Sequence, residues 1–340
     1  MNHMKIVSSL FLFLAIMLVA QHRIIAVPAT VNYYKLGNEK TAARDYSGAI
    51  EDYTKAIGQD PNNAKAYNNR GSVKMELGEL DGALEDYEKA VHIKPDYAEA
   101  YYNNAVARNE LGDYIGAVAD YTKALELNPR FINIYFSRAA AKDRIGDNEG
   151  ALADYTKAIE LNPDHADAYN NRGVTRYKLG DKDGSIADLL QAVQGYFRNG
   201  LAKADKGDKK GAIEDYTKVI GITAKNADAY NNRGNARNDL GDKEGAVSDY
   251  TKAIEFNPGH TIAYFNRGVV KASQNDKQGA IADFTKAIEY DPQYVKAFYK
   301  RGMVKSELGD EKGALEDMKQ AAKSGFESAR QFLKTQGKHW

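Results

Sequence analysis

A repeat of fixed length constrains the fold of this chain more than any other feature of its sequence. Copies of a 34-residue unit begin at Thr30, Ala64, Ala98, Ile132, Ala166, Val193, Ala227, Thr261 and Val295, and the one shorter interval, of 27 residues, separates Ala166 from Val193. We number the places in each copy from 1 to 34. Each copy holds two segments of helical length in which apolar residues recur every three or four positions. A Gly-Asp pair usually lies between the two segments, and Asn-Pro or Asp-Pro mostly follows the second. This pattern predicts two antiparallel helices per copy.

Small residues return at two places of the copies, and this indicates close contact between helices. The eighth place is Gly or Ala throughout, and the twentieth is Ala except at Ser185. A Gly inside a helix costs about 0.5–1 kcal/mol relative to Ala, so its return in seven copies indicates that another helix comes too near for a side chain. One copy alone would expose an apolar face, whereas stacked copies cover it and form a solenoid.

The fourth place is aromatic in every copy, as Tyr33, Tyr67, Tyr101, Tyr135, Tyr169, Tyr196, Tyr230, Tyr264 and Phe298. Together with the period and the small places, this pattern resembles the tetratricopeptide repeat (TPR) family over about residues 30–323. The resemblance implies an all-α fold: a TPR α-solenoid of nine antiparallel helix pairs in a right-handed superhelix, closed by a C-terminal capping helix.

The shortened interval and the two ends divide the chain into four expected parts, residues 1–29, 30–192, 193–323 and 324–340. Copies one to five fill the second part and copies six to nine the third. No Asn-Pro connection remains between them, so Gln194 and Gly195 are expected to form the turn. In the fourth part, Ser324 and Glu327 have capping-box spacing and apolar residues repeat on one helical face, which predicts a capping helix followed by a tail.

Residues 1–29 differ in kind from the repeats and resemble an export signal. The 15-residue apolar run Ile6–Ala20 is shorter than the ~20 residues that a membrane-spanning helix needs. We expect an exported protein, periplasmic or secreted, with cleavage after one of three alanines, Ala20, Ala26 or Ala29. The alternative is an uncleaved signal anchor, in which residues 6–20 alone would attach the protein to a membrane. The chain has no Cys, which is compatible with an oxidising compartment.

Charged residues also keep fixed places. The seventh place is Arg in six copies, the eleventh is basic in all nine, and the twenty-third is Asp in all nine. If the small residues at the eighth and twentieth places meet across each hairpin, the seventh and twenty-third places come within reach of each other. This predicts a row of Arg–Asp ion pairs, one per copy, which we call the Arg–Asp ladder. Such a ladder would either orient the two helices of each hairpin or form an ionic track for a ligand. We favour the structural role, because half-buried charges are normally paired.

The charge balance and the residue inventory argue against several classes of function. Lys plus Arg equals Asp plus Glu at 47 each, and no basic run with interleaved aromatics occurs, so nucleic acid is not an expected partner. The sequence holds no Cys nucleophile, no recognisable Ser-His-Asp arrangement, no phosphate-binding Gly loop and no metal-ligand spacing. His165 and His260 end their copies and are expected to be turn residues. We therefore expect no enzyme, no cofactor and no metal.

The resemblance implies that the first helices line a concave groove for partner peptides, with places two, five, nine, twelve and thirteen facing it. The fifth place is aromatic in six copies, as Tyr34, Tyr102, Phe136, Phe197, Phe265 and Tyr299. Exposed aromatic side chains are good anchors for a partner. Alternatively, each ring packs against the helix of the next copy, because aromatic side chains dominate cores.

A more specific hypothesis concerns copies seven to nine. Some TPR cochaperones hold the C-terminal carboxylate of a partner with Lys and Asn at places five and nine of one copy, Asn at place six of the next, and Lys and Arg at places two and six of the third. The matching residues here are Asn231, Asn235, Asn266, Lys296 and Lys300. Asn231 replaces a Lys and Lys300 stands where Arg is usual. Two ammonium groups and the amide donors could still hold a carboxylate by charge-assisted hydrogen bonds.

Two functions from different classes remain open at this point. The first is a non-enzymatic scaffold that binds peptide segments of partner proteins in the groove, outside the cytoplasm. The second is a carrier of a small ligand, or an accessory subunit of an envelope enzyme or secretion system.

Overall fold

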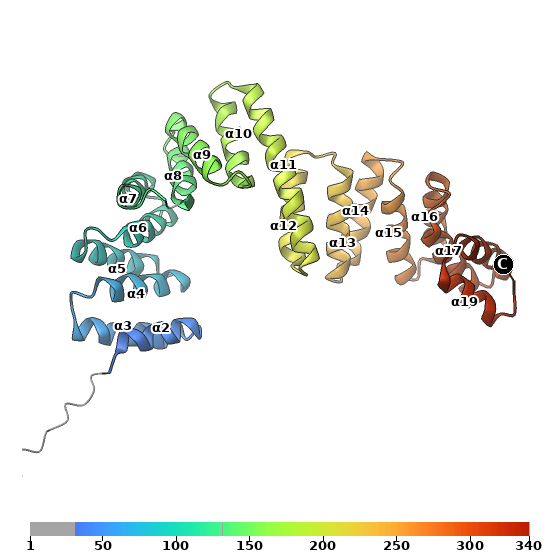
Figure 1. Cartoon of the computed structure of the whole chain (residues 1–340), viewed down its shortest axis with the longest axis horizontal. Helices are drawn as coiled ribbons and strands as arrows, with labels where there is room; N and C mark the ends of the chain where they lie inside the picture. Colours follow the sequence, from blue (N-terminus) through green and yellow to red (C-terminus); the bar gives the residue numbers. More distant parts are fainter. Residues whose placement is uncertain (1–30, 131, 340) are drawn as a thin grey trace, which may run out of the picture. The chain divides into compact units, whose positions relative to one another are not determined.

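The computed structural model describes residues 31–130 and 132–339, which are helical throughout apart from short connections (Figure 1). Within those two ranges the chain forms 18 helices and no strand, so the expected all-α class is confirmed. The predicted export signal, Thr30 and Trp340 lie outside the described residues. The chain divides into two compact units, one ending at Ile134 and the other beginning at Tyr135.

The first unit contains three helix pairs in chain order: α2 (Tyr33–Ala42), α3 (Tyr46–Gln59), α4 (Ala64–Glu76), α5 (Leu80–Ile93), α6 (Ala98–Glu110) and α7 (Tyr114–Leu127). The division between the units falls in the first turn of α8. The second unit continues with α8 (Ile132–Arg144), α9 (Asn148–Leu161), α10 (Ala166–Lys178), α11 (Lys182–Asp205), α12 (Lys209–Ile222), α13 (Ala227–Asp239), α14 (Lys243–Phe256), α15 (Thr261–Ser273), α16 (Lys277–Tyr290), α17 (Val295–Glu307), α18 (Glu311–Lys323) and α19 (Glu327–Thr335).

Local hydrogen bonds set the ends of the helices, as the pair α13 and α14 illustrates. The side chain of Asn226 precedes α13 and accepts a hydrogen bond from the backbone N–H of Ala229. After α13, Gly241 adopts a φ of 86°, a left-handed conformation that Gly enters without a steric penalty. Asp242 then caps α14 by accepting from the N–H of Gly245 at 2.9 Å. The Gly-Asp pair of the sequence therefore ends one helix and starts the next.

The two helices of a pair touch through the small places. A Cβ added to Gly234 of α13 would lie 2.8 Å from Cε1 of Tyr250 on α14, so the buried ring packs directly on the backbone of the first helix. The twentieth place is also close, because a Cβ at Gly268 would lie 3.3 Å from the carbonyl oxygen of Ala280. The contact inferred from the sequence is present, and the aromatic ring at the twenty-fourth place is its main element.

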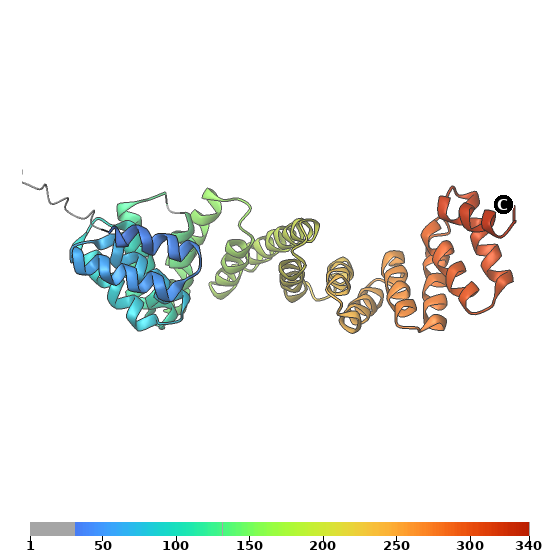
Figure 2. The same cartoon turned by 90° about the horizontal axis from the view of Figure 1, so that it is seen from below.

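Successive pairs stack through the second helix of one copy and the first helix of the next. Val270 of α15 belongs to one buried cluster with Ala246, Tyr250 and Val247 of α14. The helix pairs α3–α4, α5–α6, α9–α10, α12–α13 and α16–α17 also pack on each other, and Figures 1 and 2 show α12 to α17 following one another in chain order. This consecutive packing is the one expected for a TPR solenoid.

The prediction of a turn at Gln194 and Gly195 is wrong. α11 runs without a break from Lys182 to Asp205, so one helix holds the second helix of copy five and the first helix of copy six. No Pro stands in this segment to stop the helix. Gly195 lies inside the helix at a close contact, since a Cβ there would come within 2.8 Å of Cβ of Ala166 on α10.

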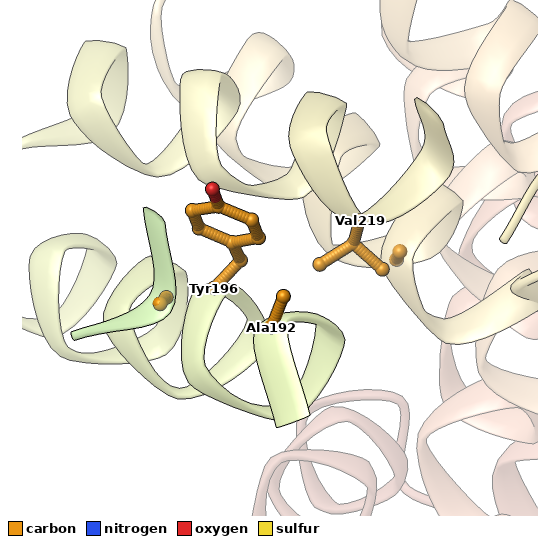
Figure 3. Close-up of a cluster of buried hydrophobic side chains, with 5 residues drawn as sticks. Ala192, Tyr196 and Val219 are labelled. Atoms are coloured by element: carbon orange, nitrogen blue, oxygen red, sulfur yellow. The ribbon is translucent and has the colours of Figure 1, made fainter. Parts of the chain in front are cut away.

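A buried cluster holds the continuous helix against its neighbours. Ala192 and Tyr196 of α11 lie beside Val219 of α12 (Figure 3), and Ala166 and Ala229 complete the cluster. The boundary between the two predicted repeat blocks, residues 30–192 and 193–323, falls inside this helix. The division of the repeats into these two blocks stays a prediction.

The predicted C-terminal cap is present as α19. Ala329 and Leu333 are buried in a cluster with side chains of α18. The capping box expected at Ser324 is wrong, because Ser324 ends α18 and Phe326 stands before α19 without a side-chain cap. The apolar face of α19, rather than a hydrogen bond at its start, therefore holds it on the last hairpin.

Candidate functional site

The predicted Arg–Asp ladder is confirmed in all six copies that carry the Arg. Each guanidinium donates from Nε and Nη2 to the two carboxylate oxygens at 2.6–2.9 Å, in the pairs Arg70–Asp86, Arg138–Asp154, Arg172–Asp188, Arg233–Asp249, Arg267–Asp283 and Arg301–Asp317. The basic residue at the eleventh place pairs with the same Asp in every copy. Each of the six carboxylates is buried and holds two cations.

The ladder also connects neighbouring copies. Nη1 of Arg267 donates to Oγ1 of Thr251 in the preceding copy at 3.0 Å, and the Arg residues of four other copies do the same. The charges of the ladder are thus engaged inside the array. This supports the structural role over an ionic track.

The six fifth-place aromatics are half-buried. Five rings contact a ring of the second helix of their own hairpin, with centroids 5.7–6.1 Å apart, in the pairs Tyr34–Tyr53, Tyr102–Tyr121, Phe136–Tyr155, Phe197–Tyr216 and Phe265–Phe284. Phe136 and Phe265 also contact the residue that precedes the next first helix, and Tyr299 contacts Phe326 before α19. The main neighbour is therefore the ring's own hairpin. A role of these residues as partner anchors stays a prediction.

The three amides of the carboxylate hypothesis bind one another. Nδ2 of Asn266 donates to Oδ1 of Asn231 at 3.1 Å and to Oδ1 of Asn235 at 2.9 Å. Lys296 and Lys300 are exposed on α17. To bind a carboxylate, the Asn266 amide would have to give up its hydrogen bonds to Asn231 and Asn235. The carboxylate hypothesis stays a prediction.

A cavity of about 480 Å³ opens beside the first helices α8 and α10. We use the name first-helix face for the surface formed by places two, five, nine, twelve and thirteen of the first helices. The walls of the cavity are Ala140, Asp143, Arg144, Tyr155, Asn171, Val174 and Lys178, and five of these residues belong to the first-helix face. In three other hairpins the phenol donates to a polar side chain at the ninth place, as Tyr250 does to Asn235. Ala140 has no such group, and its small side chain leaves the space open.

Asp143 is the polar centre of this cavity. Its carboxylate accepts hydrogen bonds from Oγ1 of Thr175 at 2.9 Å and from the phenol of Tyr155 at 3.2 Å, and Nζ of Lys178 lies 3.2 Å away. Burial, reinforced by the charge of Asp143, raises the pKa of Tyr155, so the phenol remains a donor. The Lys178 side chain is 44% exposed, so it can leave Asp143 to meet a ligand. The cavity can therefore hold a polar or charged group.

Sequence reasoning did not single out Asp143, Thr175 or Lys178. A signal was present, because the tenth place is Val or Ala in seven copies and Thr only in copy five. The Thr175 side chain is fully buried and is satisfied by Asp143 of the preceding copy. A polar residue at an otherwise apolar place of a repeat was the clue.

His165 and His260 precede α10 and α15 and cap them. Nδ1 of each accepts from the backbone N–H three residues further on, at 3.3 Å. Burial lowers the pKa of His165, which favours the neutral ring that this contact needs. Across residues 31–130 and 132–339, no group of three or more His, Cys, Asp or Glu side chains could hold a metal ion. None of the helices described is both long and apolar enough to span a membrane.

Family models match much of the repeat region. A model described as TPR repeat matches residues 37–78, 71–109, 144–180 and 200–241. Two models described as tetratricopeptide repeat match residues 98–131 and 227–260, and residues 262–294. Residues 132–143, 181–199 and 295–323 of the repeat region are among those that these matches leave out, and the second of these segments contains the junction inside α11.

Solved structures resemble parts of the chain. A crystal structure of MamA is 26% identical over 48% of this chain and 95% of its own, with a TM-score of 0.46. A MamA structure from Desulfovibrio magneticus RS-1 is 15% identical over 48% of this chain and 92% of its own, with a TM-score of 0.46. YrrB, titled a TPR protein with an unusual peptide-binding site, is 23% identical over 63% of this chain and 96% of its own, with a TM-score of 0.37. No curated protein matches the sequence.

Proposed function

The chain belongs to the tetratricopeptide repeat family, a protein-interaction fold, and from this premise we propose that it is a non-enzymatic scaffold that binds peptide segments of partner proteins on its first-helix face. The cavity beside α8 and α10 carries the proposal. It combines an exposed apolar side chain, Val174, with an exposed ammonium group, Lys178, above the shielded carboxylate of Asp143.

These groups suit an extended peptide segment. Main-chain groups of the peptide can hydrogen-bond to the amide of Asn171, and an apolar side chain can cover Val174, which is 45% exposed. An acidic side chain can draw Lys178 away from Asp143, because the Lys178 side chain is 44% exposed and the carboxylate keeps the hydrogen bonds from Thr175 and Tyr155. We therefore expect partner segments in which an apolar and an acidic residue lie close together.

Photo-crosslinking tests whether partners meet this face. A benzoylphenylalanine placed at Val174 should form discrete adducts with other proteins in envelope extract, because Val174 lines the cavity. The matched control is the same residue at Leu161, which is 39% exposed on the second helix α9. Purified peptides derived from the crosslinked proteins should then bind the full chain and bind Lys178→Glu more weakly. Identical adducts from both positions, or peptides that bind wild type and variant equally, would contradict the proposal.

The volume of the cavity favours one alternative, a carrier of a small ligand. About 480 Å³ falls within the ~300–1,000 Å³ typical of small-molecule sites. Three of its seven wall residues carry charges, whereas such sites are mostly apolar. Native mass spectrometry of the full chain, purified gently, distinguishes the two: a stoichiometric small-molecule adduct would favour the carrier.

We further propose that the protein works outside the cytoplasm, on the basis of the apolar run Ile6–Ala20. N-terminal sequencing of the native protein should begin at Gln21, Val27 or Thr30, since cleavage would follow one of three alanines. An uncleaved protein recovered with membranes would indicate the signal anchor instead. An intact Met1 form recovered in the soluble cytoplasm would contradict export.

A further inference from the structure

The first half of α11 lacks the cover that second helices have elsewhere. Where second and first helices stack, the apolar twenty-first place is half-buried, as at Ile50, Leu84, Leu152, Ile213, Val247 and Ile281. In α11 the same place is Ile186, which is 58% exposed. The next first helix is the continuation of α11 and cannot fold back over it. Of the helices described, α10 and α12 are the ones that pack extensively on α11.

The uncovered face is also more apolar than its counterparts. At five stacked junctions the twenty-fifth place is a Thr whose hydroxyl accepts a hydrogen bond from the Arg of the next copy. In α11 this place is Leu190, which is 52% exposed and lies one turn after Ile186. Ile186 and Leu190 thus expose two large apolar side chains one turn apart, and the array otherwise covers the place of Ile186 with a helix.

The apolar residues continue along the same side of α11. Val193, Phe197 and Leu201 follow Leu190 at spacings of three, four and four residues, which keeps them on one helical face. A cavity of about 390 Å³ is lined in part by these three residues. We call the set Ile186, Leu190, Val193, Phe197 and Leu201 the α11 stripe. It spans roughly 22 Å at 1.5 Å per residue, the length of about four helical turns.

We propose that the α11 stripe is a docking site for an amphipathic helix of a partner protein. The fold itself indicates what covers such a face: α15 covers the equivalent face of α14, with Val270 seated against Val247, Ala246 and Tyr250. A partner helix can do the same where the chain supplies none, with apolar anchors at every third or fourth residue. This surface goes beyond the proposed peptide site, because Ile186 and Leu190 belong to a second helix. Only Phe197 and Leu201, at places five and nine of copy six, are shared with the first-helix face.

The sequence of α11 also sets the chemistry of the partner helix. A Val or Ala should face Ile186, as Val270 faces Val247. Opposite Leu190 the partner should present an apolar residue instead of the Arg that pairs with Thr elsewhere, because Leu190 has no hydroxyl to accept a hydrogen bond from a guanidinium. The structure therefore assigns the site to a helix whose central residues are apolar.

A helix from this protein supplies the probe. We would synthesise a lactam-bridged, fluorescent peptide with the sequence Thr261–Ser273 and a second version with Arg267→Leu, and titrate each with the full chain. The Leu version should bind saturably and the Arg version more weakly. Ile186→Glu and Leu190→Glu should each weaken the Leu version by about tenfold or more, because a carboxylate would be buried without a partner. Ile115→Glu, which alters an Ile 73% exposed on α7, should leave binding unchanged.

A specificity exchange gives a second, independent readout. Leu190→Thr restores the acceptor that Thr251 provides for Arg267, so this variant should prefer the Arg version. Failure of both peptides to bind saturably, equal binding by wild type and Ile186→Glu, or an unchanged preference in Leu190→Thr would each overturn the proposal. Self-association of the full chain that Ile186→Glu abolishes would also overturn it, because the stripe would then be covered by a second copy.

Discussion

Replacing Asp249 by Ala is expected to destabilise the hairpin of α13 and α14 by about 3–5 kcal/mol, because the change leaves cations without their buried partner. Asp249 is 2% exposed and accepts from Nε and Nη2 of Arg233 at 2.9 and 2.7 Å. Nη1 of Arg237 lies 2.9 Å from the same carboxylate. Hydrogen exchange of the α13 and α14 amides is the suitable measurement, since stability in a solenoid is a sum over neighbouring units.

The matched control for Asp249→Ala is Lys252→Ala in the same helix. Lys252 pairs with Glu255, and the two side chains are 49% and 54% exposed, so its removal should change the stability by about 0–1 kcal/mol. Asp249→Asn should fall between the two variants, because it keeps the shape and one acceptor oxygen but loses the charge and the second acceptor. Equal protection of the α13 and α14 amides in Asp249→Ala and Lys252→Ala would show that the ladder adds little to stability.

Gln194→Pro is expected to destabilise the array by about 3 kcal/mol or more, because residue 194 lies in the middle of the continuous helix α11. The proline ring would remove the hydrogen bond that residue 194 donates within the helix and would clash with the carbonyl group of residue 190. Urea denaturation followed by circular dichroism measures the loss. The measurement distinguishes a continuous helix from a turn at residue 194, since a proline would be tolerated at a turn.

Two controls accompany Gln194→Pro. Gln194→Ala should change stability by less than about 0.5 kcal/mol, because the side chain is exposed. Ala224→Pro introduces proline at the thirty-second place, where six other copies have it, in the connection between α12 and α13. It should be neutral or should stabilise by up to about 1 kcal/mol. If Gln194→Pro were tolerated as well as Ala224→Pro, the turn indicated by the sequence would be right and the continuous helix wrong.

The Arg–Asp ladder shows how much of this structure local pattern can predict. Places seven and twenty-three lie on facing turns of an antiparallel pair, so the repeat spacing alone was enough to bring Arg233 to Asp249. The stacking of copies adds the contact from Arg267 to Thr251, which the sequence did not reveal. The Arg–Asp pairs could be predicted because the geometry of one hairpin fixes both residues of each pair.

The candidate sites were less predictable, because they depend on residues of different copies. Asp143 and Thr175 are 32 residues apart and meet only when α10 packs beside the preceding hairpin. The six fifth-place aromatics were proposed from their spacing, but which ring each one contacts depends on packing angles that no single copy determines. The carboxylate hypothesis likewise grouped Asn231, Asn235 and Asn266, but the sequence did not reveal that the Asn266 amide donates to the other two.

The sequence by itself determined the helix class, the period and the ends of most helices, because caps, Gly turns and Pro act through contacts within a few residues. Only the tertiary structure decided the junction of copies five and six. Losing the Asn-Pro connection permits either a short turn or a continuous helix, and local signals do not distinguish them. The close contact of Gly195 with Ala166 and the buried cluster around Tyr196 are made by the continuous helix, so packing between copies selects it.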